Sequence, residues 1–80
     1  MQLPIKAIAV FHAAARAGSI SRAADELGVT PSAVSQQIQL LETHLGVALL
    51  TKAGRGVALT EAGERYFSMI SEQIEGIEEA

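Results

Sequence analysis

The sequence contains no cysteine and no tryptophan, and its aromatic residues are limited to one tyrosine and two phenylalanines. The absence of cysteine excludes disulfides, thiolate chemistry and cysteine-ligated metals, and it is compatible with a reducing compartment. Because 49% of the residues are hydrophobic, we expect a packed core of Ala, Leu, Ile and Val. No apolar run approaches the roughly 20 residues of a membrane-spanning helix, and the N-terminus lacks the apolar stretch of a signal peptide. We therefore expect a cytoplasmic protein without a membrane segment.

Positive charge is also scarce, and the formal net charge is −3. An acidic chain argues at first against DNA binding, but the charges are unevenly distributed. Residues 1–60 contain five bases and three acids, whereas residues 61–80 contain one base and six acids. This asymmetry allows a DNA-binding surface on the first part while the acidic part projects away. Because the basic surface is thin, we expect non-specific DNA binding to be weak.

Catalytic and metal-binding patterns are missing. A chain of 80 residues forms one domain at most and offers little scaffold for a catalytic cleft. The sequence has neither a nucleophile elbow nor a phosphate-binding loop. His12 and His44 are isolated and lack the spacing of metal ligands. The sequence therefore predicts a protein that is not an enzyme and that holds no metal or cofactor.

Three helices are predicted in the first 45 residues. Apolar residues recur at helical spacing over 3–17. Ser19 is a suitable N-cap for a second helix that runs to Leu27, and Thr30 is a suitable N-cap for a third helix at about 31–45. The second and third helices, joined by a short turn, form a helix-turn-helix motif.

A β-hairpin and a fourth helix are predicted to follow. The short apolar runs 47–51 and 57–59 flank a basic, glycine-containing segment, which predicts a hairpin with a five-residue loop at 52–56. Thr60 is a suitable N-cap for the last helix, where Gly63 is unfavourable unless close packing requires a missing side chain. Further along this helix, a 3-4-3 spacing of apolar residues predicts a coiled-coil-like homodimer interface, formed by Phe67, Ile70, Ile74 and Ile77.

The helix-turn-helix has the features of a DNA-binding motif. The major groove is about 12 Å wide and admits one α-helix, whose first residues must be small or polar to reach the base edges. The first turns of the third helix carry such residues: Pro31, Ser32, Ser35 and Gln36. The hairpin offers Lys52 and Arg55 to the flanking backbone or minor groove.

Together these elements predict a mainly α-helical fold. Residues 1–60 are expected to form a winged helix-turn-helix domain, with helix 31–45 in the major groove of double-stranded DNA. The β-hairpin is the wing, whose segment at about 52–57 is expected to contact the flanking groove. Residues 61–80 are expected to form a linker helix that joins two copies of the chain.

Three segments carry a resemblance to a known family. They are the run from Ser21 to Ile38, the pairs Leu41-Glu42 and Leu45-Gly46, and the run from Leu49 to Gly63. These segments, which lie within residues 21–63, resemble the LysR-type transcriptional regulators, and the similarity covers nearly the whole chain. The resemblance is specific because a helix-turn-helix, a wing and a Leu-Thr-Glu-Ala-Gly signature occur in one order.

The resemblance implies a winged helix-turn-helix followed by a linker helix through which the protein dimerises. In the family, a separate C-terminal effector domain senses a small molecule, and we expect no such domain in these 80 residues. Full-length members act as tetramers on interrupted palindromes. By position, the family's base contacts fall on Pro31, Ser32, Ser35 and Gln36, and its wing arginine falls on Arg55. Backbone contacts are implied at Ser21, Arg22, Thr30, Gln37 and Lys52.

Two positions depart from the family's usual pattern. Leu50 stands where the family usually has Phe, and the smaller side chain is expected to loosen the packing of the wing. Lys52 stands where Arg is usual, which keeps the charge but loses the planar guanidinium group.

Two alternatives stay open at this point. The chain could be a winged-helix protein-interaction or dimerisation module that does not bind DNA, since its positive charge is low. Arg22 could pair with Glu26, four residues later on the same helix, instead of contacting a phosphate. An affinity that falls steeply with rising salt distinguishes DNA binding from an apolar protein interface.

Overall fold

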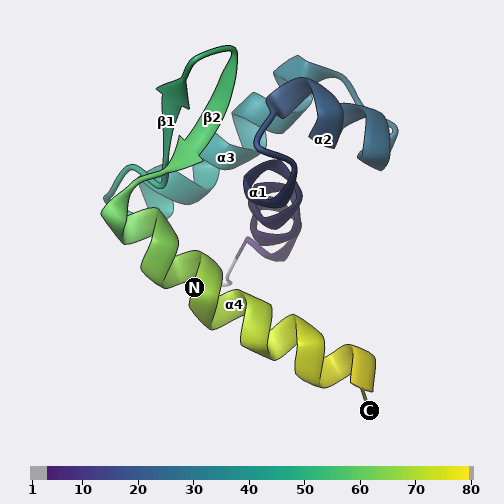
Figure 1. Cartoon of the computed structure of the whole chain (residues 1–80), viewed down its shortest axis with the longest axis vertical. Coiled ribbons are helices and arrows are strands. Elements are labelled where there is room, and N and C mark those ends of the chain that lie inside the picture. Colours follow the sequence, from purple (N-terminus) through teal and green to yellow (C-terminus); the bar gives the residue numbers. More distant parts are fainter. Residues whose placement is uncertain (1–3, 80) are drawn as a thin grey trace.

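Residues 4–79 form four helices and one two-stranded hairpin. The computed structural model describes the backbone of these residues and the side chains of residues 4–72. In chain order the elements are α1 (Ile5–Ala17), α2 (Ile20–Leu27), α3 (Pro31–Leu45), β1 (Leu50–Ala53), β2 (Gly56–Leu59) and α4 (Glu61–Glu79) (Figure 1). The predicted mainly α-helical fold with a small hairpin is confirmed. Within the described residues, no helix combines the length and the apolar character needed to cross a membrane.

Side-chain caps define the starts of α2 and α3. The Ser19 hydroxyl accepts a hydrogen bond from the N–H of Arg22 at 3.2 Å, and the Thr30 hydroxyl accepts one from the N–H of Ala33 at 3.1 Å. Each bond satisfies a backbone N–H that has no partner inside its helix, and each is worth roughly 1 kcal/mol. Gly28 ends α2 in the left-handed conformation, with φ 68° and ψ 33°, and so directs the chain into α3. The predicted boundaries of the helix-turn-helix are therefore confirmed.

The core consists mainly of small and aliphatic side chains, as the composition predicts. The central helix is α1, which packs against α2, α3, α4 and β2 (Figure 1). Alanines on α1 and α2 allow close approach of the neighbouring helices. The buried residues are Ala7, Val10, Phe11, Ala13, Ala14, Ala23, Ala24, Val34, Ile38, Leu41, Leu49 and Ile70.

Aromatic contacts attach α4 to this core. The ring centroid of Phe11 lies 5.9 Å from that of Tyr66 and 6.4 Å from that of Phe67. The Phe67 ring also stacks on His12, with the centroids 4.9 Å apart, and Nε2 of His12 lies 3.2 Å from Oγ of Ser71. Desolvation by burial raises the pKa of the Tyr66 phenol above its ordinary value, so this residue is neutral at physiological pH. The first part of α4 therefore shares the core with α1, and the helix then extends away from it (Figure 1).

The hairpin loop is shorter than the sequence pattern predicted. The antiparallel pairing of β1 and β2 continues up to Ala53 and Gly56, so the loop consists of Gly54 and Arg55 alone. The prediction of a five-residue loop at 52–56 is wrong, because backbone hydrogen bonds extend the ladder past the apolar side chains. Gly54 has φ 58°, and among the described residues only glycines have a positive φ, so φ of Arg55 is negative. A positive φ at the first central position only is the sign pattern of a type II′ turn, which suits a two-residue hairpin.

Candidate nucleic-acid interface

The first turns of α3 expose a polar surface. Val34, Ile38 and Leu41 are buried on the opposite side of the helix. All four predicted base-contacting residues are exposed: Pro31, Ser32, Ser35 and Gln36. None of them carries a long or branched apolar side chain, so this end of the helix can approach the base edges of a groove. The four predicted positions therefore lie together on one accessible surface.

The N-terminus of α3 favours a nearby anion. Thr30 is exposed, and its hydroxyl oxygen caps the helix by accepting the N–H of Ala33. The hydroxyl hydrogen can still donate to a phosphate oxygen, and the helix dipole adds a partial positive charge at this end. Residues 31–45 include no Lys or Arg. Full positive charges beside α3 must therefore come from neighbouring elements.

The first turn of α2 supplies one of these charges. Ser21 and Arg22 are both exposed there. Glu26 pairs with Arg16 and not with Arg22: Oε2 of Glu26 lies 3.3 Å from a guanidinium nitrogen of Arg16. Among the side chains that the structure describes, Arg22 forms no ion pair, so the alternative role as an intrahelical partner of Glu26 is wrong.

The wing presents Lys52 and Arg55. Lys52 is exposed on β1, and Arg55 is exposed at the tip of the two-residue loop. The hairpin is anchored on the corner between α1 and α2, where the N–H of Val57 donates to the carbonyl oxygen of Gly18 at 3.1 Å. A Cβ at Gly56 would lie 2.2 Å from that same oxygen, so only glycine fits at this contact. The backbone therefore fixes the position of the wing relative to α1.

The end of α3 and the start of the wing are joined by polar contacts that sequence reasoning missed. Oε2 of Glu42 accepts hydrogen bonds from the N–H groups of Leu49 at 2.7 Å and Leu50 at 3.3 Å. The Thr60 hydroxyl donates to the carbonyl oxygen of Ala48 at 2.6 Å. Glu42 entered the sequence analysis through the family resemblance alone. No spacing rule indicates a contact that crosses the irregular segment between α3 and β1.

A helix cap and close packing complete the junction between the wing and α4. The Thr60 hydroxyl also caps α4 by accepting the N–H of Gly63 at 3.0 Å, which confirms the predicted start of that helix. A Cβ at Gly63 would lie 2.0 Å from the carbonyl oxygen of Leu49, so close packing is the reason for a glycine at this otherwise unfavourable helix position. Leu50 is half-buried and packs against the core, so the smaller side chain at this position still anchors β1.

The predicted dimer interface lies on α4. Phe67 is half-buried, Ile70 is 7% exposed, and both contact the core of their own chain. The side chains of Ile74 and Ile77 lie outside the described residues. Met69 on the same helix is 54% exposed, and it lines a shallow apolar surface with Leu45, Val47, Leu49, Ala62 and Tyr66. The assignment of this face to dimer contacts stays a prediction.

The sequence of this chain is similar to those of known regulatory proteins. A family model described as bacterial regulatory helix-turn-helix protein, lysR family, matches residues 5–64. The HTH-type transcriptional regulator TrpI of Pseudomonas aeruginosa is 59% identical over 61 residues, which cover 76% of this chain and 21% of that protein. The glycine cleavage system transcriptional activator of Escherichia coli is 48% identical over 77 residues, which cover 96% of this chain and 25% of that protein. The chain thus spans a quarter or less of the length of these relatives.

Solved structures have the same fold. A complex of the BenM DBD with catB site 1 DNA superposes with a TM-score of 0.85 at 29% identity, covering 99% of this chain and 86% of that chain. A CbnR DBD–DNA complex superposes with a TM-score of 0.83 at 33% identity, covering 99% of this chain and 88% of that chain. With the family model matching residues 5–64, this chain belongs to the bacterial LysR family of regulatory helix-turn-helix proteins.

Proposed function

We propose that this chain binds double-stranded DNA sequence-specifically, as the N-terminal DNA-binding part of a bacterial transcription regulator. The observation that carries the proposal is the exposed surface of Ser32, Ser35 and Gln36 at the start of α3, which is backed by a buried apolar face. The similarity to two proteins solved in complex with DNA supports the same mode of docking. The relatives are named as transcriptional regulators, which supports a cytoplasmic, non-enzymatic protein.

In this mode α3 enters the major groove. The Gln36 amide can form two hydrogen bonds with adenine, and the serine hydroxyls can donate to or accept from base edges. Arg55 at the wing tip enters the flanking minor groove, where a narrow groove concentrates negative potential. Phosphates are contacted by residues on and around α3: Ser21 and Arg22 on α2, Thr30 just before α3, Gln37 within α3 and Lys52 on β1.

Two copies are expected to join through α4, using the face that bears Phe67, Ile70, Ile74 and Ile77. A homodimer presents two copies of α3 related by two-fold symmetry, so its site is an interrupted palindrome. The full-length protein is proposed to form tetramers and to sense a small molecule through a C-terminal effector domain outside these 80 residues.

The test is selection of bound sequences from a random duplex library. The purified chain is mixed with the library at low and at moderate salt, and the retained duplexes are sequenced. We expect enrichment of an inverted repeat, and we expect retention to fall steeply with salt because phosphate contacts release counterions. A folded chain that retains no duplex at either salt would contradict the proposal. Self-association that is insensitive to salt would then favour a protein-interaction module.

A further inference from the structure

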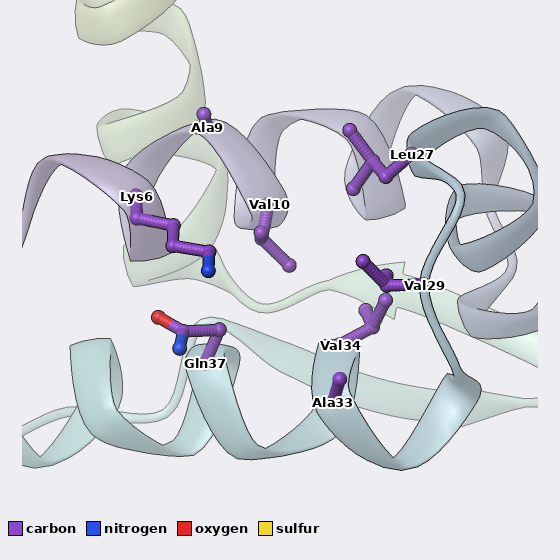
Figure 2. A pocket seen from close by; sticks show the side chains of 8 residues that line it. All are labelled: Lys6, Ala9, Val10, Leu27, Val29, Ala33, Val34 and Gln37. Carbon is purple, nitrogen blue, oxygen red and sulfur yellow. The ribbon is translucent and has the colours of Figure 1, made fainter.

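A basic side chain of α1 lies beside α3. Lys6 is exposed in the first turn of α1, and Figure 2 shows its side chain reaching across a groove toward the amide of Gln37 on α3. The rest of the groove is lined by apolar side chains of α1, α2, α3 and the connection between α2 and α3, among them Val10, Leu27 and Val34. Lys6 belongs neither to the helix-turn-helix nor to the wing, and no sequence motif assigns it a role.

Two elements flank α3 on opposite sides. Gln37 faces the start of α1 across the groove, whereas Glu42 faces the start of β1 through its bonds to Leu49 and Leu50. Gln37 and Glu42 are five positions apart in the sequence, which corresponds to about 140° around a helix at 3.6 residues per turn. The buried stripe of α3 lies between them. The start of α1, which carries Lys6, and the start of the wing therefore meet α3 on different sides of the helix.

This arrangement matches the two walls of a major groove. An α-helix with its side chains is about 10–12 Å across, and the groove is about 12 Å wide, so both flanks of an inserted helix lie near sugar–phosphate backbones. On the wing side, Lys52 and Arg55 supply positive charge. On the other side, Lys6 supplies positive charge from the protein groove between α1 and α3.

We propose that Lys6 and Gln37 together bind a phosphate of the DNA backbone on the α1 side of α3. The Lys6 ammonium group donates to the phosphate oxygens, and the Gln37 amide nitrogen donates a second hydrogen bond. The aliphatic part of Lys6 lines the apolar groove, and its charged end stays accessible to a phosphate. This inference rests on the proposed DNA binding and extends the binding surface to α1.

The decisive comparison is Lys6→Gln against Arg65→Gln. Both substitutions remove one positive charge from an exposed residue, but Arg65 lies on α4, where it pairs with Glu61 at 2.6 Å. Binding is measured over a range of salt, on a duplex selected from the library and on a scrambled duplex of equal length. Lys6→Gln is expected to weaken both affinities by roughly threefold to tenfold at low salt. It is also expected to reduce the slope of log affinity against log salt by about 0.9 per bound chain. Lys6→Arg is expected to restore both values.

A double-mutant cycle tests whether the two residues share one phosphate. If they do, Lys6→Gln and Gln37→Ala together weaken binding by less than the product of the separate effects. Fully multiplicative effects overturn the shared site, and a Lys6→Gln variant that matches Arg65→Gln in slope and affinity overturns the Lys6 contact. Circular dichroism melts confirm that each variant is folded. Wild-type chain that binds no duplex contradicts DNA binding itself, whereas wild-type binding with an unaffected Lys6→Gln contradicts the Lys6 inference alone.

Discussion

Oε2 of Glu42 accepts a hydrogen bond from the backbone N–H of Leu49 at 2.7 Å, and the same oxygen accepts the N–H of Leu50 at 3.3 Å. One side chain of α3 thus holds the first residue of β1 and the residue before it. Because the wing begins at this point, Glu42 helps to set the distance between Arg55 and the surface of α3 that we propose to contact DNA. The Leu-Glu pair that supports the family resemblance therefore has a structural role at the interface.

Replacing Glu42 is expected to lower the free energy of unfolding. Glu42→Ala leaves two backbone N–H groups without their charged acceptor, which is expected to cost about 2–3 kcal/mol. Glu42→Gln keeps an acceptor oxygen and is expected to cost less. Urea unfolding measures both variants, with the exposed Asp25→Ala as a control that stays within about 0.5 kcal/mol of wild type. Equal stabilities of Glu42→Ala and Asp25→Ala would show that these hydrogen bonds do not stabilise the fold.

Adding a single methyl group at Gly63 is expected to be costly. Its Cβ would lie 2.0 Å from the carbonyl oxygen of Leu49, so either α4 or the segment before β1 must shift. Gly63→Ala is therefore expected to destabilise the chain by about 2–3 kcal/mol, although alanine favours an isolated helix. Ser68→Ala, at an exposed position of the same helix, is the control. A thermal melt in which Gly63→Ala equals or exceeds wild type would contradict the close contact.

Local signals predicted much of this fold, because each acts within a few residues. Ser19 and Thr30 cap helices through N–H groups three residues ahead, and a sequence pattern shows this spacing directly. The loop length depended instead on how far β1 and β2 continue to pair beyond their apolar residues. The contacts of Glu42 and the approach of Lys6 to Gln37 join segments that no periodicity links. Burial of Ile70 against α1 is equally non-local, since the 3-4-3 spacing identifies an apolar face without its partner.

Base selection is expected to depend on Gln36. Gln36→Ala removes the amide that can pair with adenine, which is expected to cost about 1–3 kcal/mol on the preferred duplex and to relax preference at one base pair. Gln39→Ala, exposed one turn further along α3, is the matched control with a smaller effect on both. Library selection with each variant gives the preference at every position. An unchanged preference and affinity for Gln36→Ala would mean that α3 uses another surface.

Arg55 is expected to contribute through the shape of the flanking minor groove. Arg55→Lys keeps the charge but binds a narrow groove less well, so we expect its affinity to fall more on A-tract flanks than on G·C-rich flanks. Arg55→Ala is expected to weaken binding on both flanks and to reduce the salt slope by about 0.9. Titrations of the two flank designs at several salt concentrations separate these effects. Equal losses for Arg55→Lys on both flanks would place Arg55 on the phosphate backbone instead.

The predicted dimer interface on α4, the 3-4-3 seam of Phe67, Ile70, Ile74 and Ile77, gives different expectations for two isoleucines one turn apart. Ile70 is 7% exposed in its own chain, so Ile70→Asp buries an unpaired carboxylate and is expected to unfold the protein. Ile74 belongs to the same 3-4-3 seam, and Ile74→Asp is expected to leave a folded monomer, because a charge at a seam position opposes helix pairing. Ser68→Asp, at an exposed position of the same helix, introduces the same charge and is expected to stay dimeric. Sedimentation velocity with a parallel circular dichroism melt distinguishes these states. A folded Ile74→Asp dimer would place the interface elsewhere, and the exposed apolar surface that includes Met69 and Val47 would then be the next region to substitute.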